Sequence, residues 1–397
     1  MIDPITLNTI THEYNTPSYI FDENLLLENI ENIKKLLPDN TKLCYAIKAN
    51  PFLAETVSTS VDRLEVCSPG EYEICMRCSI PPDKIIMSGV NKTYESIKSV
   101  LSRSMGAGLY TIESPNQYKL FGQVIKNSGI TLTQKPRLLL RLSSRNQFGM
   151  DISTLTKIYE KAKNDNFATV KGIHYYSGTQ KSIKKIAKDI LLLNKIKQQL
   201  SDKDNFDIEL EYGPGLSIPY FLNENIDISS SLKEFSNELV SITAFSDITI
   251  ELGRYITANC GYYITKIVDI KETYDNNYLI VDGGIHQLNY YGQLMGMKTP
   301  HLHLIHNRET PPYKKKSQQY TICGSLCTSN DILVKNVNLS SPQIDDYIIF
   351  ERCGAYSSTE GIAMFLSREL PQILLIHNNK IELIRELTHI NKLNSKQ

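Results

Sequence analysis

The sequence has no excess of charge of either sign, because 43 lysine and arginine residues balance 43 aspartate and glutamate residues. This balance argues against the basic surface by which proteins bind nucleic acid. No apolar run reaches the roughly 18–20 residues that a membrane-spanning helix needs. Residues 1–17 lack a basic segment followed by an apolar one, so we expect no secretory signal peptide. These absences favour a cytoplasmic protein without nucleic-acid or membrane partners.

The composition is that of a globular protein, with 41% hydrophobic and 22% charged residues over 397 positions. A chain of this length predicts about two or three domains. Without an export signal, the eight cysteines are interpreted as reduced thiols and not as a disulfide framework.

Short β-rich runs alternate with longer helical stretches over the first two-thirds of the chain. The expected strands are 42–47, 63–67, 84–89, 108–113, 137–142, 170–176, 206–212 and 248–252. Helical periodicity is found in 93–104, 115–128, 181–200 and 230–242. An open doubly wound sheet shows the same alternation but usually has about five or six strands. Eight strands therefore favour an α/β protein with a (β/α)8 TIM barrel.

After about residue 255 the pattern changes to strand-like runs separated by turns, which predicts an all-β C-terminal domain. The run 17–22 is a further strand that precedes the barrel and could return to pair in the β domain. The predicted organisation is an N-terminal strand in 1–24 that joins the β domain, a barrel in 25–255, and a β-sandwich or β-barrel domain in 256–397.

Residues with reactive side chains stand where the barrel strands end, and the C-terminal ends of barrel strands form the active-site face. Lys48 follows the first strand, and His174 lies on the sixth. The seventh strand ends in the glycine-rich turn EYGPGL (211–216), whose backbone N–H groups could face a phosphate. The eighth carries Glu251 and leads to Arg254.

This set of side chains suits pyridoxal phosphate. A lysine amine such as that of Lys48 can form a Schiff base with it, and the pyridine ring then acts as an electron sink. A carboxylate facing the ring nitrogen keeps that nitrogen protonated, a role that Glu251 fits. His174 fits as the imidazole stacked on the ring. The glycine turn, Ser177 and Arg254 can neutralise the phosphate.

The sequence resembles the fold-type III pyridoxal-phosphate decarboxylases, which include the diaminopimelate and ornithine decarboxylases, over nearly its whole length. The ordered motifs are YAIKANP (45–51), LEVCSPGE (64–71), IIMSGVNKT (85–93), IES (112–114), QFGM (147–150), GIHYYSGTQ (172–180), GPG (213–215), ELGR (251–254), VDGG (281–284), GSLCTSND (324–331) and CGAY (353–356). The resemblance implies an alanine-racemase-like barrel plus a β domain, pyridoxal 5'-phosphate as cofactor, no metal, and a homodimer with active sites at the interface.

The resemblance also implies a role for each matching position. Lys48 would be the Schiff-base lysine, Glu251 the pyridinium partner and His174 the stacking residue. Cys327 would return a proton to the carbanion after CO2 leaves, reaching the cofactor from the subunit that does not supply Lys48. The other implied cofactor-binding residues are Arg141, Ser177, Gly213, Gly215, Gly253, Arg254 and Tyr356.

Two positions depart from the family pattern. The usual triple glycine is G-P-G here, and Pro214 removes one N–H donor to phosphate. Relatives that act on ornithine or diaminopimelate usually carry an acidic residue directly after the catalytic cysteine, where this chain has Thr328. Because a buried unpaired ammonium costs several kcal/mol, we expect a substrate whose distal amine is conjugated.

The segment CTSND (327–331) is similar to the subgroup that serves siderophore and natural-product pathways. That similarity makes N-citryl-ornithine, or another citryl-diamino acid, the preferred small-molecule substrate. Its expected contacts are Thr328, Asp331, His286 and Arg308.

Other interpretations stay open. Within the family these are a diaminopimelate or ornithine decarboxylase and a carrier-protein-bound glutamyl decarboxylase, and outside it an amino-acid racemase on the same barrel. A non-catalytic cofactor-binding protein would lack the β domain. The CMRC pair (75–78) and the HLHLIH stretch (301–306) offer too few convergent ligands for a metal site.

Overall fold

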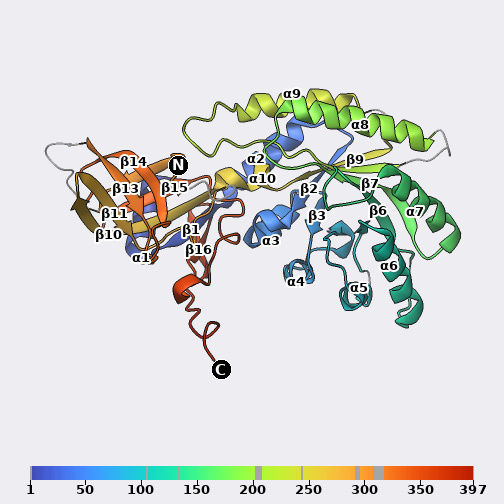
Figure 1. Ribbon diagram of the computed structural model, residues 1–397, viewed down its shortest axis with the longest axis horizontal. Coiled ribbons are helices and arrows are strands. Elements are labelled where there is room, and N and C mark those ends of the chain that lie inside the picture. The colour runs from blue at the N-terminus through green and yellow to red at the C-terminus, as the bar shows by residue number, and fades with distance from the viewer. Residues whose placement is uncertain are drawn as a thin grey trace. The chain divides into compact units, whose positions relative to one another are not determined.

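The computed structural model describes residues 2–103, 106–132, 134–201, 208–242, 245–290, 296–307 and 317–396. The chain forms two compact units (Figure 1). The barrel unit comprises Asn29–Ile218 and Ile226–Ile256. The β unit comprises Met1–Glu28, Pro219–Asn225 and Thr257–Gln397 and is therefore built from three separate stretches of chain.

The barrel unit contains eight parallel strands that close on themselves, because the first strand, β2, pairs with the last, β9. The strands are β2 (Thr41–Ala46), β3 (Arg63–Val66), β4 (Ile85–Met87), β5 (Leu109–Ile112), β6 (Arg137–Leu142), β7 (Thr169–Tyr176), β8 (Glu209–Gly213) and β9 (Asp247–Leu252). Their burial on both faces explains the runs of valine, isoleucine and leucine. The predicted (β/α)8 barrel is confirmed.

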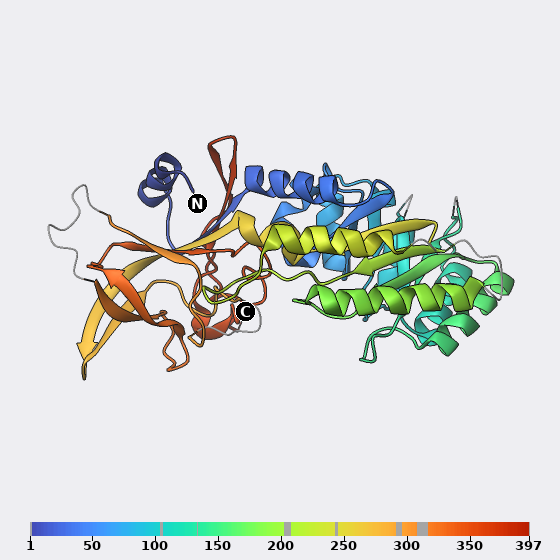
Figure 2. The same ribbon diagram turned by 90° about the horizontal axis from the view of Figure 1, so that it is seen from above.

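Helices alternate with these strands, and α8 and α9 lie side by side (Figures 1 and 2). They are α2 (Glu23–Leu36), α3 (Ala54–Ser58), α4 (Pro69–Arg77), α5 (Tyr94–Leu101), α6 (Pro115–Asn127), α7 (Ile152–Asp165), α8 (Ile183–Ser201), α9 (Ile228–Val240) and α10 (Arg254–Thr257). Side chains cap several of their N-termini: Ser68, Ser114 and Asp227 each accept a hydrogen bond from a backbone N–H of the first turn. These caps fix where each loop leaves the barrel's active-site face.

Among the described residues, the β unit contains a nine-stranded sheet. The helix α1 (Pro4–Glu13) precedes its first strand. The main strand order is β14-β13-β11-β10-β1-β16-β17, and β15 pairs with β10 and β12. The bounds are β1 (Ser18–Asp22), β10 (Gly261–Thr273), β11 (Asn276–Val281), β12 (Leu302–Ile305), β13 (Ser317–Cys323), β14 (Ile332–Ser340), β15 (Tyr347–Glu351), β16 (Gln372–His377) and β17 (Lys380–Arg385).

Strand β1 lies in the interior of this sheet. It pairs antiparallel with β10, with Ser18 opposite Ile264, and parallel with β16, with Ser18 opposite Gln372. Its apolar residues are fully buried; Ile20, for example, belongs to a core cluster with Ile264 of β10 and Leu374 of β16. The sequence thus places its first strand between two strands that come much later in the chain.

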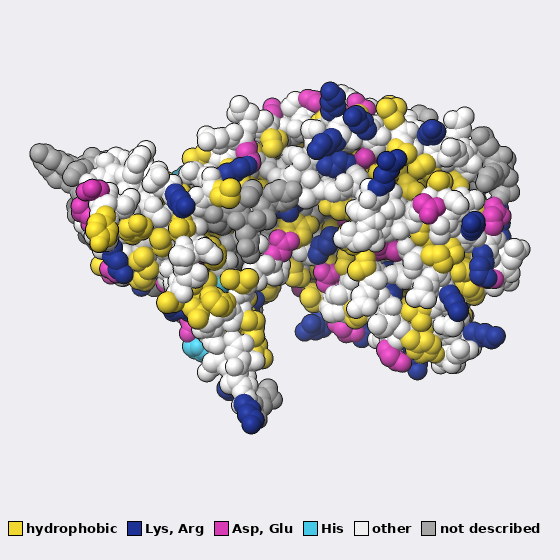
Figure 3. Space-filling view, viewed as in Figure 1, with side chains coloured by type: hydrophobic (Ala, Val, Ile, Leu, Met, Phe, Trp, Pro, Cys, Tyr) yellow, Lys and Arg dark blue, Asp and Glu magenta, His cyan; other side chains and the backbone are white. Residues whose placement is uncertain are grey.

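The visible surface carries lysine and arginine interspersed with aspartate and glutamate (Figure 3). This agrees with the balanced composition. Among the described helices, none is both long enough and apolar enough to cross a membrane.

Candidate active site

Lys48 follows β2 directly, in a short 3-10 turn formed by Ile47–Ala49. Its Nζ atom lies 2.6 Å from Oε2 of Glu65, 3.6 Å from Sγ of Cys67 and 3.5 Å from Oε1 of Glu251. The Tyr45 hydroxyl donates a 2.8 Å hydrogen bond to the Asn50 carbonyl, which ties the end of the turn back to the strand. The lysine amine is thus held at the barrel mouth between carboxylates of β3 and β9.

Glu251 joins Lys48 to His174. The Nε2 atom of His174 lies 3.1 Å from Oε2 of Glu251, and both side chains are buried. Burial raises the pKa of Glu251, but the charge on Lys48 and the hydrogen bond with His174 outweigh it and hold that pKa well below its ordinary value. Glu251 is therefore an anion in an enclosed site, as the predicted role opposite a ring nitrogen requires.

Ser177 and the glycine turn after β8 lie next to each other. The Lys181 backbone N–H donates a 2.8 Å hydrogen bond to the Gly215 carbonyl. Gly215 has φ +65°, and a Cβ there would collide with the Gly178 carbonyl oxygen, so only glycine fits. By contrast, a Cβ on Gly178 would meet no atom within 4 Å, which shows open space above Ser177–Gly178.

The loops after the last barrel strands are where barrel enzymes commonly bind phosphate. Gly213 ends β8, and Gly215 lies in the loop that follows. Gly253 lies in the loop after β9, and the buried Arg254 begins α10. The structure thus brings the predicted phosphate-binding residues of the barrel unit to these neighbouring strand ends.

Arg141 points from β6 to a carboxylate that the sequence analysis did not identify. Its Nη1 atom lies 3.0 Å from Oε1 of Glu113, which directly follows β5, and its guanidinium lies 4.8 Å from the centre of the Phe148 ring. Lys92 is also buried here, and its Nζ donates a 2.5 Å hydrogen bond to the Gly89 carbonyl. Burial lowers the pKa of Lys92 to about 8.

Glu211 on β8 is another residue that the sequence analysis missed. It is fully buried, and neither carboxylate oxygen has a hydrogen-bond partner within the described part of the chain. Burial, and then the negative charges of Glu251 and Glu65, raise its pKa well above the ordinary value. Glu211 therefore keeps its proton to a higher pH than an ordinary carboxyl group does, whereas Glu251 keeps its charge to a lower pH. The sequence signal that could have identified Glu211 is an acidic residue within the strand-like run FDIELEY (206–212).

The predicted proton donor, Cys327, lies in the β unit and is exposed. Its loop is held by Asp331, which is 2% exposed. Asp331 Oδ2 accepts a 2.7 Å hydrogen bond from the Leu326 N–H, and Oδ1 accepts a 2.8 Å bond from the Ile285 N–H. Asp331 is one of the predicted substrate contacts, whereas in the structure its carboxylate is turned inward and holds the loop of residues 324–331.

The other expected residues of the β unit are placed as follows. His286 is buried, and burial together with the charge of Arg368 lowers its pKa to about 4, so it is neutral and enclosed. Thr328 lies next to Cys327 on the loop surface, and its Oγ1 atom accepts a 3.4 Å hydrogen bond from the Asn330 N–H. Tyr356 has φ +64° in a turn closed by a 3.0 Å bond from the Glu360 N–H. Arg308 lies outside the described residues.

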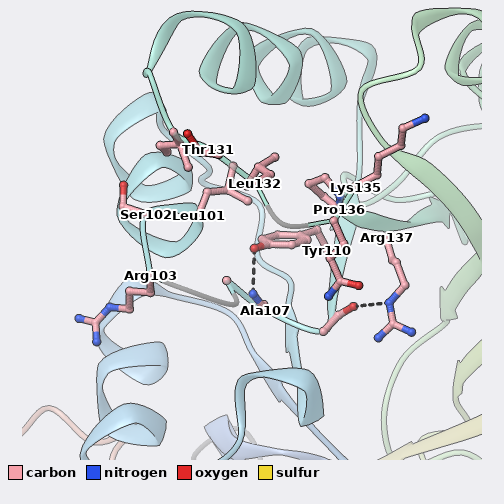
Figure 4. A pocket seen from close by; sticks show the side chains of 14 residues that line it. Leu101, Ser102, Arg103, Ala107, Tyr110, Thr131, Leu132, Lys135, Pro136 and Arg137 are labelled. Carbon is pink, nitrogen blue, oxygen red and sulfur yellow. Dashed lines mark hydrogen bonds between the residues drawn. The ribbon is translucent and has the colours of Figure 1, made fainter.

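A cavity of about 70 Å³, open to solvent, lies at the opposite end of the barrel strands (Figure 4). Its walls include Tyr110, whose hydroxyl accepts a 2.9 Å hydrogen bond from the Ala107 N–H. Arg137 donates to the Gly108 carbonyl at 2.9 Å. These residues stand at or near the starts of β5 and β6, so this cavity is distinct from the site around Lys48.

The chain is similar over most of its length to known pyridoxal-dependent decarboxylases. A family model described as "Pyridoxal-dependent decarboxylase, C-terminal sheet domain" matches residues 19–354. The diaminopimelate decarboxylase of Aquifex aeolicus is 24% identical over 97% of this chain and 92% of its own length. The crystal structure of diaminopimelate decarboxylase from Helicobacter pylori, complexed with L-lysine, has the same fold, with a TM-score of 0.83, 21% identity and 98% of both chains covered.

A relative of a different kind is also similar. The 2-[(L-alanin-3-ylcarbamoyl)methyl]-2-hydroxybutanedioate decarboxylase of Staphylococcus aureus is 25% identical over 96% of this chain and 99% of its own length. The family model covers well over half of the chain, and the barrel with its separate sheet agrees with it. The chain therefore belongs to the fold-type III pyridoxal-phosphate-dependent decarboxylases, the family of the diaminopimelate and ornithine decarboxylases, and is an amino-acid carboxy-lyase.

Proposed function

We propose that this enzyme removes the α-carboxylate of an amino acid whose distal amine is already conjugated, and that the conjugating group is citryl. The preferred substrate is N-citryl-ornithine or another citryl-diamino acid, in siderophore biosynthesis. The observation that carries the proposal is the cysteine loop, residues 324–331, and what its side chains offer.

That loop has one carboxylate, and its oxygens are occupied by hydrogen bonds to the backbone. Asp331 accepts hydrogen bonds from two backbone amides and is buried. The residue after Cys327 is Thr328, which carries no charge. A free distal ammonium placed against this loop would have no anionic partner from it, and an unpaired buried ammonium costs several kcal/mol. A substrate with an amide at that position avoids the cost.

The similarity to the Staphylococcus aureus enzyme supports the same conclusion. Its name describes an alanine joined through its third carbon and an amide to a 2-hydroxybutanedioate, which is a citryl-type conjugate. At 25% identity this relative supports the substrate class and leaves the length of the diamine open.

The residues of the barrel unit fit the cofactor. When bound, pyridoxal phosphate supplies an electron sink for the electron pair left at Cα by departing CO2. Lys48 would hold it covalently, since its side chain is 39% exposed and its amine lies within reach of Glu251. Glu251 would keep a proton on the ring nitrogen, and His174 would orient the ring. Ser177, Gly213, Gly215 and Arg254 would bind the phosphate.

The exposed thiol of Cys327 would donate the proton that completes the reaction at Cα. We further propose that the protein is a homodimer in which Tyr356 adds to the phosphate site, as the family resemblance implies. Light scattering of the holoenzyme measures this directly, and a monomer mass would contradict it.

The test of the substrate is CO2 release by the holoenzyme from ornithine, lysine, diaminopimelate, and the citryl conjugates of ornithine and diaminopropionate. We expect turnover of a citryl conjugate and at least a 100-fold lower kcat/KM for the free diamino acids, the loss that a buried unpaired charge produces. Thr328→Glu should shift this preference toward ornithine or diaminopimelate, with Thr328→Ser as the matched control. Preference of the unaltered enzyme for a free diamino acid would refute the proposal.

The alternative substrate is diaminopimelate, which the Aquifex aeolicus relative decarboxylates. The same panel separates the two, because only this alternative gives CO2 from unmodified diaminopimelate. Deuterium incorporation at Cα without CO2 release would instead indicate a racemase.

A further inference from the structure

Asp189 of α8 gathers three hydrogen-bond donors behind the glycine turn. Its Oδ2 atom accepts from the Ser177 hydroxyl at 2.6 Å, from the Tyr212 hydroxyl at 3.0 Å, and from the Lys181 ammonium. The Lys181 ammonium also contacts the Ser177 hydroxyl oxygen. Lys181 and Asp189 are both largely enclosed, with side-chain exposures of 8% and 13%. Because lysine is rarely buried inside proteins, the burial of Lys181 indicates a specific role for its ammonium group.

The three donors exceed what one oxygen accepts well, because each carboxylate oxygen offers two lone-pair directions. One donor can therefore leave Oδ2 for another acceptor and still leave the carboxylate satisfied. Tyr212 is fully buried on β8. Ser177 and Lys181 remain as the two donors that can turn.

The backbone fixes Lys181 beside the proposed phosphate site. Its N–H bonds to the Gly215 carbonyl at 2.8 Å, and its carbonyl accepts a 2.9 Å bond from the Ser217 hydroxyl. The neighbouring Gln180 side chain donates to the Ile218 carbonyl and accepts from the Ile218 N–H, both at 2.8 Å. The segment 177–181 is thus joined to 215–218, and the ammonium is one hydrogen bond away from the Ser177 hydroxyl.

We propose that Lys181 is a cationic ligand of the cofactor's phosphate, held in place by Asp189 until the phosphate arrives. The inference rests on the proposed phosphate-binding role of Ser177 and Gly215. It also accounts for Pro214, which withdraws one backbone N–H from the turn. The cation replaces the missing donor with a charge-assisted hydrogen bond, which is stronger than a neutral one.

The proposal predicts that substitutions of Lys181 and of Asp189 change the affinity for the cofactor in different ways. If the lysine and aspartate only hold the fold together, loss of either partner weakens cofactor binding through the same structural damage. If Lys181 binds phosphate, Asp189 competes with the phosphate for the same ammonium. Lys181→Met should then weaken cofactor binding, whereas Asp189→Asn should leave it unchanged or strengthen it.

The experiment measures the dissociation constants of the apoenzyme for pyridoxal 5'-phosphate and for pyridoxal by equilibrium dialysis. Lys181→Met should raise the constant for the phosphorylated compound about 10- to 100-fold, the strength of a hydrogen bond to a charged group. The constant for pyridoxal, which carries no phosphate, should stay within about twofold. Lys184→Met, which replaces an exposed lysine at the start of α8, is the matched control and should change neither constant.

Because Lys181→Met leaves a buried aspartate without its cation, the variant could fail to fold. The double variant Lys181→Met with Asp189→Asn removes both charges and avoids this. We expect the double variant to bind the phosphorylated cofactor as weakly as the single lysine variant. Equal weakening for pyridoxal and pyridoxal 5'-phosphate, or normal affinity in the folded double variant, would overturn the proposal.

Discussion

At the scale of single residues, the barrel interior holds two carboxyl groups whose pKa values are shifted in opposite directions. Lys48 and His174 contact Glu251 and lower its pKa, whereas the Glu211 carboxylate has no hydrogen-bond partner among the described residues and its pKa is raised. Burial affects both groups in the same direction, so the contacts decide the difference. A pair with pKa values pushed apart is characteristic of sites that must keep one proton fixed.

The raised pKa of Glu211 predicts a pH dependence of stability. Its folded-state pKa lies above the ordinary value of 4.5, so above that pH the folded protein retains a proton that the unfolded chain has lost. Stability therefore falls as the pH rises from about 4.5 toward the folded-state pKa. Glu211→Gln removes this loss and should raise the melting temperature at pH 7–8. Between those two pKa values the gain in the free energy of unfolding grows by about 1.4 kcal/mol for each increase of one in pH.

The measurement is the melting temperature of wild type and variant from pH 4 to pH 8. The gain should vanish near pH 4, where the carboxyl is protonated in both states. Glu209→Gln is the control on the same strand, because Glu209 faces Arg63 at 3.5 Å and should show no such gain. A Glu211→Gln variant whose destabilisation grows as the pH rises would mean that the carboxyl group is ionised in the folded protein.

At the scale of elements, the cysteine loop depends on one inward carboxylate. Asp331 holds the Leu326 and Ile285 amides, and a Cβ on Gly284 or Gly324 would contact its oxygens. The loop is therefore built around Asp331, with Cys327 at its exposed end.

Asp331→Asn should uncouple the loop from the sheet. Asparagine keeps one acceptor oxygen, so one of the two amides loses its partner at a cost of about 1–3 kcal/mol. We expect kcat to fall while the dissociation constant for pyridoxal 5'-phosphate stays within about twofold, because the barrel unit is unaltered. Asn330→Ala, on the exposed side of the same loop, is the control, and a loss confined to cofactor affinity would contradict this role.

The barrel strands could be predicted from the sequence, whereas some of the helices could not. Periodicity located each barrel strand to within a few residues, as in 137–142, which is β6, and 248–252 within β9. It also placed Lys48, His174 and Glu251 on the active-site end, since that follows from strand direction alone. The helices α1 and α3 were not predicted, because α3 spans only five residues and α1 buries only Thr6, Leu7 and Ile10, which do not form a clear apolar repeat.

Contacts across the barrel interior could not be predicted. Glu65, Glu113 and Glu211 come from β3, the end of β5 and β8, and which of them meets Lys48 or Arg141 depends on the stagger of the closed barrel. The inward orientation of Asp331 depends in the same way on loop packing. Residue type and strand position indicated the chemistry of the site, whereas its ion pairs could be identified only from the three-dimensional structure.

At the scale of the whole molecule, the β unit needs the start of the chain. Deleting residues 2–22 removes β1 from between β10 and β16 and leaves two unpaired strand edges. We expect the truncated protein to be mostly insoluble and to lose strand signal in circular dichroism. Truncation after Ile390, which removes an exposed tail, is the control and should have little effect. Soluble, fully active protein without residues 2–22 would contradict the need for β1.

The pairing of Ser18 with Gln372 also has a consequence for synthesis on the ribosome. Strand β1 leaves the exit tunnel before both of its neighbours, because β10 follows about 250 residues later and β16 roughly 350 residues later, which at about 5–20 residues per second is some 12–70 seconds. The barrel strands are all translated within that interval and can close first. During that time the apolar run SYIFD must be kept from pairing with other nascent chains. Strand β1 is thus translated before both strands that it pairs with, and holding chaperones would act on its segment during synthesis.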